Sequence, residues 1–260
     1  MNFICSLLLS IIWLFWSAPA QAETLAERVA AFPEWQSKPT TQTAKGDLAY
    51  PTWLAGAWHV KSTLVDLVAP FAPDLVTPGF ESNRDYLNQP VDFDVRFVRQ
   101  KVASRNAIAT ALKSLQSKPE ETEVVADRAF NGLNLAKAYL GDRAVLAVKV
   151  DPSSPNRQIT LLRGDRQLVS IVNARAIETP SVNQFITTEI FQQVFRGTPQ
   201  PYLNQVETTT AYQRGTTIEA NQITAVYLSP QDPNYFKSGE TPVALYRYRL
   251  EFLPVADSHQ

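Results

Sequence analysis

Few side chains in this sequence could perform metal, nucleophilic or acid–base chemistry. There are two histidines, His59 and His259, and a single cysteine, Cys5. Zinc, copper and haem iron are usually held by several His or Cys ligands, and the sequence does not bring such residues together. We therefore expect no metal site, and nothing in the sequence indicates another cofactor.

Motifs for serine catalysis or phosphate binding are also missing. The sequence has no Gly-x-Ser-x-Gly turn, and the segments after Gly79 and Gly164 lack the glycine spacing of a phosphate-binding loop. A pair of carboxylates such as Asp94 and Glu207 could act as a general acid and base. Ion pairs or solvated strand faces explain the two carboxylates better, so an isomerase or hydrolase is the weakest of our functional hypotheses.

Hydroxyl and amide side chains are frequent in the second half of the chain, within segments that read as strands. One explanation is an outward β face, where Thr is favoured; the other is a barrel interior that fixes a small amphipathic ligand. Alternation along residues 206–212 places Thr208, Thr210 and Tyr212 on the same side as Val206. We therefore expect some of these hydroxyls to face inward.

The strands that position these residues are recognisable from period-two alternation. From Leu54 to Leu64 one face carries Gly56, Trp58 and Val60, and the other carries His59 and charge, as in a half-buried strand. Residues 184–195, 203–213, 217–228 and 243–252 are long, rich in Thr, Val, Ile and Tyr, and joined mostly by short turns. The pattern predicts a mainly β fold, a single antiparallel β-barrel of eight to ten strands with one or two short helices. We expect the last strand to pair with the first and so remove both sheet edges.

Strand parity selects the candidate site. The residues expected on the inner faces are mostly aromatic, with a few hydroxyl groups, and suit an apolar body with one polar end. The candidate ligand-binding residues are Trp58, Val60, Thr208, Thr210, Tyr212, Tyr246 and Tyr248.

The segment Gly56-Ala-Trp58 resembles the start of lipocalins and other calycins, in which this Trp closes the barrel floor. Calycins often pack a late Arg across that Trp, but alternation here places both Arg247 and Arg249 outside. The resemblance implies a calycin-like barrel that binds a small apolar or amphipathic ligand, such as a pigment, lipid or quinone.

A second resemblance covers most of the chain after the N-terminal leader. The Trp-Leu-x-Gly-x-Trp start, Asn131-Gly132, residues 191–197 and residues 227–233 are similar to an uncharacterised family of exported cyanobacterial and chloroplast lumenal proteins. This resemblance implies a location in the periplasm or thylakoid lumen and brings no known reaction. It keeps open an alternative function, a scaffold or assembly factor that contacts a membrane-protein complex and holds no ligand.

The chain divides into four parts. Residues 1–22 read as a signal peptide, because an apolar run ends at Ala20-Gln-Ala22; an uncleaved anchor is the alternative. Residues 23–49 form an N-terminal arm that we expect to be mobile, with a short helix near its start. Residues 50–253 form the barrel, which is followed by a tail at 254–260, and residues 100–120 have helical spacing. The net charge of −1 gives no indication of nucleic acid as a partner.

Overall fold

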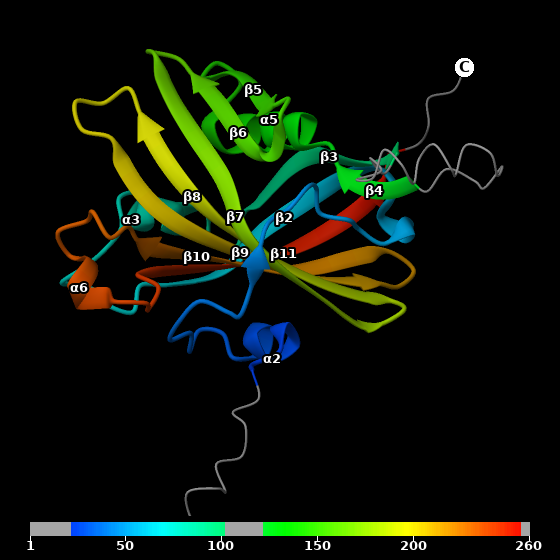
Figure 1. Cartoon of the computed structure of the whole chain (residues 1–260), viewed down its shortest axis with the longest axis horizontal. Coiled ribbons are helices and arrows are strands. Elements are labelled where there is room, and N and C mark those ends of the chain that lie inside the picture. Colours follow the sequence, from blue (N-terminus) through cyan, green and yellow to red (C-terminus); the bar gives the residue numbers. More distant parts are fainter. Residues whose placement is uncertain (1–21, 102–121, 256–260) are drawn as a thin grey trace, which may run out of the picture.

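The alternating segments of the sequence form one antiparallel sheet in the computed structural model, which describes residues 22–101 and 122–255 (Figure 1). Ten strands curl into a half-barrel in the order β4-β3-β2-β11-β10-β9-β8-β7-β6-β5. The strands are β2 (Gly56–Val68), β3 (Pro90–Lys101), β4 (Thr122–Ala126), β5 (Val145–Asp151), β6 (Ser154–Leu162), β7 (Arg166–Ser181), β8 (Gln184–Arg196), β9 (Tyr202–Arg214), β10 (Ile218–Leu228) and β11 (Ala244–Pro254). A short strand, β1 (Gln42–Thr43), pairs with β7.

Three sequence-based expectations lie outside the described residues, at least in part. They are the signal peptide except for its last residue, the helix expected over 100–120 from residue 102 onward, and the tail from residue 256. Within the described ranges, no helix is long and apolar enough to cross a membrane.

The sheet is open where the sequence predicted a closed barrel. The last long strand does pair with the first, with Phe252 opposite Val60. However, a long connection after β2 returns the chain to the other side of that strand as β3, with Val95 opposite Trp58. Strand β2 is therefore interior, and the edges of the sheet are β4 and β5, which do not pair with each other.

Helix α5 (Arg128–Leu140) occupies the gap between these two edges. It contacts β3 on one side and β5 and β6 on the other (Figure 1). The side chain of Asp127 caps its first turn by accepting from the Phe130 backbone N–H, and the helix ends before Gly141, whose φ of 84° suits glycine. A helix thus completes the wall that strand pairing leaves open.

The remaining helices are short. They are α2 (Leu25–Ala30), α3 (Phe80–Asn83) and α6 (Tyr235–Ser238), with 3-10 turns η1 (Thr52–Leu54) and η2 (Arg84–Tyr86). The sequence predicted one or two helices, and the described part of the chain has four. Helix α2 lies within the predicted arm and starts at a capping box, in which Thr24 and Glu27 satisfy each other's backbone N–H groups.

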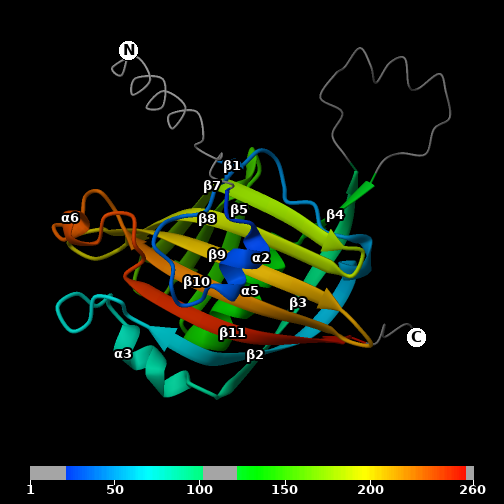
Figure 2. The same cartoon turned by 90° about the horizontal axis from the view of Figure 1, so that it is seen from below.

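The N-terminal arm packs against the sheet, which corrects the expectation of a mobile segment. Figure 2 shows α2 lying across the outer face of the sheet, over β8 and β9, with α5 on the opposite side. Arg28, Trp35 and Leu48 are each at most 2% exposed. The arm contributes buried side chains to the fold, so residues that the sequence analysis assigned to a mobile arm cover part of the barrel domain.

Two apolar clusters lie on the inner face and one on the outer face. Val60, Phe185, Tyr212, Leu250 and Phe252 belong to the cluster that fills one end of the half-barrel. A second inner cluster, around Leu64, Phe80 and Tyr246, lies near α3. The outer cluster joins Trp35 of the arm to β10 and β11. The interior is therefore filled most completely at the end where β2 begins.

Candidate functional site

All seven residues selected from the sequence lie on the inner face of the half-barrel. The register across the sheet pairs Tyr212 with Ala220 and Ala220 with Leu250, and one row further it joins Thr210 to Tyr248 through Gln222. Directly paired residues project to the same side of an antiparallel sheet. This side faces α5, because the hydroxyls of Tyr139 in α5 and Ser62, opposite Leu250, lie 3.3 Å apart.

Trp58, Val60 and Tyr212 fill the closed end instead of lining an open space. The Trp58 indole donates to the Leu54 carbonyl at 2.8 Å, and its ring meets Phe252 edge-on at 6.3 Å. Tyr212 is 9% exposed and packs against Phe185 and Phe252. Val60 and Tyr212 belong to the core cluster at this end, and the half-buried Trp58 packs against that cluster.

The opposite end of the inner face is only partly covered. Thr208 is half-buried, as is Thr224 directly opposite it. Phe195 and Tyr202, whose rings lie 5.8 Å apart, are half-buried at the end of β8 and the start of β9. The inner face is thus a closed floor that passes into an open, aromatic and hydroxyl-bearing wall.

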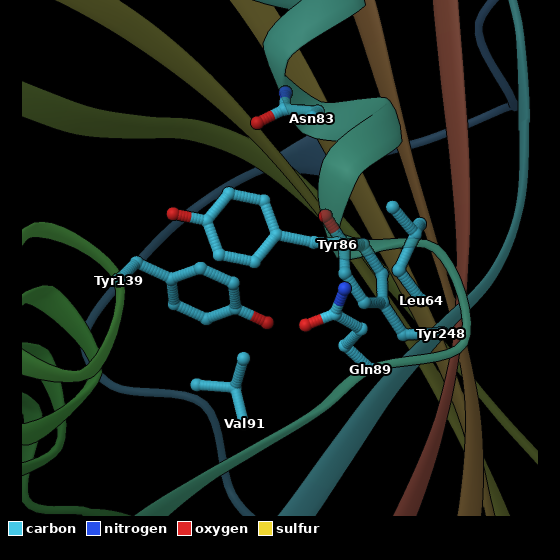
Figure 3. Close-up of a pocket in the computed structure, with 7 residues that line it drawn as sticks. All are labelled: Leu64, Asn83, Tyr86, Gln89, Val91, Tyr139 and Tyr248. Carbon is cyan, nitrogen blue, oxygen red and sulfur yellow. The ribbon is translucent and has the colours of Figure 1, made fainter.

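A small pocket opens on this inner face where α5 meets η2, β2, β3 and β11 (Figure 3). None of its lining residues is charged, and three are tyrosines from different elements; the lining is Leu64, Asn83, Tyr86, Gln89, Val91, Tyr139 and Tyr248. The space enclosed is about 10 Å³, which holds one water molecule. We call it the tyrosine pocket.

The phenols of the tyrosine pocket are suited to donate hydrogen bonds. Burial raises the pKa of Tyr139 and of Tyr248 above the ordinary range for phenols, so both remain protonated near neutral pH. Among the described residues, the Tyr248 hydroxyl has no hydrogen-bond partner, and neither does that of Tyr246. The two candidate tyrosines therefore present free donors to whatever occupies the inner face.

An ion cluster joins α5 to the wall opposite the tyrosine pocket. Arg128 of α5 donates to Glu189 of β8 at 3.0 Å and to Asp47 at 2.9 Å, and Arg175 of β7 also lies 3.0 Å from Glu189. Burial alone would lower the pKa of Arg128, but Glu189, with smaller contributions from Tyr50 and Asp47, raises the pKa overall. The two arginines balance the two carboxylates, so the cluster holds the helix in place.

Sequence reasoning did not find this cluster. Arg128 and Glu189 are 61 positions apart, and nothing local marks them as partners. Arg175 and Glu189 are directly opposite in the register of β7 and β8, and strand alternation is the one sequence signal that bears on their shared face.

The two carboxylates considered as a general acid and base lie in different parts of the fold, and each already has a hydrogen-bond partner. Glu207 is fully buried under the arm, where Arg28 and the Tyr227 hydroxyl both donate to it at 2.8 Å. Asp94 is exposed and lies 2.9 Å from His59. Across the described ranges no group of three or more His, Cys, Asp or Glu side chains could hold a metal ion.

The late arginines lie on the outer face, as alternation predicted. Arg247 donates to the Asn221 side chain and lies over the ring of Phe32 from the arm, and Arg249 pairs with Glu251. Both border a shallow outer groove of about 470 Å³ beside the arm. The calycin arrangement, with an Arg packed across the first-strand Trp, is absent from the described residues.

Comparison with known proteins identifies one family. Its model, described as a domain of unknown function (DUF6816), matches residues 42–256. No curated protein and no solved structure matches the chain.

Proposed function

The chain belongs to the family of domains of unknown function DUF6816, and we propose that it is an exported, non-enzymatic protein that binds a small amphipathic ligand on the inner face of its half-barrel. The proposal rests on one observation. The seven residues chosen from the sequence lie on a single inner face that is closed at one end and half-exposed at the other.

The chemistry of this face suggests how a ligand would lie. An apolar body would lose its hydration shell against the half-buried rings of Phe195 and Tyr202. A polar end would accept from the unpartnered hydroxyl of Tyr248 or from Thr208. Pigments, lipids and quinones all have this form. The predicted signal peptide would direct the protein to the periplasm or thylakoid lumen.

The proposal can be tested by quenching of tryptophan fluorescence with retinol and with a long-chain fatty acid as probes. We expect saturable quenching at micromolar concentration, or about −8 kcal/mol. Tyr248→Phe should weaken binding about fivefold, since it removes one hydrogen bond without opening a cavity. Lys61→Ala, on the outer face opposite Glu251, is the matched control and should leave binding unchanged. Quenching that does not saturate with either probe, or equal effects of the two substitutions, would reject ligand binding on this face.

A second function, the scaffold that contacts a membrane-protein complex, is favoured by a different observation. The tyrosine pocket has room for one water molecule, and the floor end of the half-barrel is filled by side chains. Native mass spectrometry of protein purified from its own host separates the two functions. A bound small molecule released by solvent supports the first, whereas a ligand-free protein that co-migrates with a membrane complex supports the second.

A further inference from the structure

Four arginines gather at the corner of the molecule where β5, β6, β7 and β8 meet. The turn between β6 and β7 carries Arg163 and Arg166, and the Arg166 Nε–H donates to the Arg163 carbonyl at 3.1 Å. Arg163 in turn donates from its backbone to Ala144 at 2.9 Å and from its side chain to the Arg143 carbonyl. Arg196 ends β8 opposite Gln167, beside Arg166 at the start of β7. We call Arg143, Arg163, Arg166 and Arg196 the arginine corner.

The arginine corner holds positive charge that no carboxylate of the described residues pairs with. All four side chains are exposed, and within the described residues none of the four forms an ion pair. Residues 137–146, 163–166 and 196 together contain five cationic side chains and two carboxylates, Asp142 and Asp165. The whole chain has a net charge of −1, so the excess of positive charge is local to this corner.

Exposed leucines lie beside the arginine corner. Leu140, at the end of α5, is 55% exposed and Leu146, in β5, is 59% exposed. Both flank the loop at Arg143 and Ala144 that is bonded to Arg163. Helix α5 is rich in Leu and Ala, and its residues are half-buried except for the exposed Leu135 and Leu140. Exposed apolar side chains beside arginines are the combination that binds the interface of a bilayer.

We propose that this corner docks on an anionic lipid bilayer. Leu140 and Leu146 would enter the headgroup region, and the four guanidiniums would pair with lipid phosphates, which they match in geometry. The corner lies at the half-exposed end of the inner face, next to Phe195, which precedes Arg196. Docking there would bring that open end close to the membrane. The inference concerns the outer surface alone and does not depend on a ligand being bound inside.

Co-sedimentation of the chain from Glu23 onward with lipid vesicles tests the proposal. We expect binding to vesicles that mix phosphatidylglycerol with phosphatidylcholine, little binding to pure phosphatidylcholine, and release at ~0.5 M salt. Replacing Arg163 and Arg166 by Gln should lower the partition coefficient by about fivefold per arginine. Leu146→Ser should weaken binding several-fold without changing the salt dependence.

Matched controls separate docking from a general loss of charge or stability. Arg84→Gln with Arg249→Gln removes the same charge from two exposed arginines elsewhere, each of which has a carboxylate partner. Val182→Ser removes a side chain that is 84% exposed at the opposite end of β7. Urea melts of every variant check that it folds. Equal binding to charged and neutral vesicles, no binding to either, or equal losses in the control pair would overturn the proposal.

Discussion

Arg28→Met is expected to destabilise the protein by about 3–5 kcal/mol, because it leaves a buried carboxylate without its cation. In the native protein the guanidinium holds both Glu207 oxygens at 2.8 Å. Arg28 is 2% exposed and Glu207 is fully buried, so water cannot replace the lost partner. The Arg28 guanidinium also lies 3.8 Å from the centre of the Trp35 ring, a contact that the substitution weakens.

The size of this effect depends on what remains around Glu207. Two other donors reach its carboxylate, the hydroxyls of Tyr227 and Thr209, each at 2.8 Å. They partly satisfy the oxygens but bring no positive charge, so a large penalty remains. Removing both charges in Arg28→Met with Glu207→Leu should therefore cost less than either single substitution.

Urea unfolding of the two single variants and the double variant measures the coupling. We expect the double variant to lie closer to the wild type than Arg28→Met does, with an interaction energy of about 2 kcal/mol or more. Thr24→Ala, which removes the cap of α2, is a control that should cost only about 1 kcal/mol. A loss below about 1 kcal/mol for Arg28→Met would mean that the arm is not held as described and would refute the reasoning.

Three further outcomes are expected. Gly197→Ala should cost about 1–3 kcal/mol of stability, because φ is +92° and the new Cβ would lie 2.6 Å from the backbone of the facing turn. Gly141→Ala, at φ +84° with open space around it, should cost less. Urea melts of the two variants measure the difference. Trp58→Ala should cost about 3 kcal/mol in the same assay, and a loss below about 1 kcal/mol would remove Trp58 from the barrel floor. Burial raises the pKa of Tyr212 and of Tyr248 above the unfolded value near 10, so the folded protein keeps protons that the unfolded chain loses. The contribution of these two tyrosines to stability should be constant below about pH 10 and fall above it. Phenolate absorbance followed during alkaline titration checks this, and full ionisation of all tyrosines before unfolding would contradict it.

The strands and their faces followed from the sequence alone. Alternation is local, since neighbouring side chains of a strand point to opposite sides, so parity placed Trp58, Thr210 and Tyr248 on one face without knowledge of the fold. The same argument placed Arg247 and Arg249 outside. The pairing of β2 with β11 was also expected, because joining the last strand to the first removes sheet edges.

Tertiary structure decided the features that depend on distant parts of the chain. Whether β2 is an edge strand depends on where β3 pairs after a long connection, and no local sequence pattern predicts that pairing. The arm held through Arg28 and Glu207 and the ion cluster of Arg128 and Glu189 both join residues more than 60 positions apart. The closing position of helix α5 depends on where the sheet places β3 and β5. The arginine corner has the same origin, because the β6–β7 turn with Arg163 and Arg166 meets Arg143 before β5 and Arg196 at the end of β8. Sequence alternation fixes which way a side chain points, whereas only the folded sheet fixes which side chains it meets.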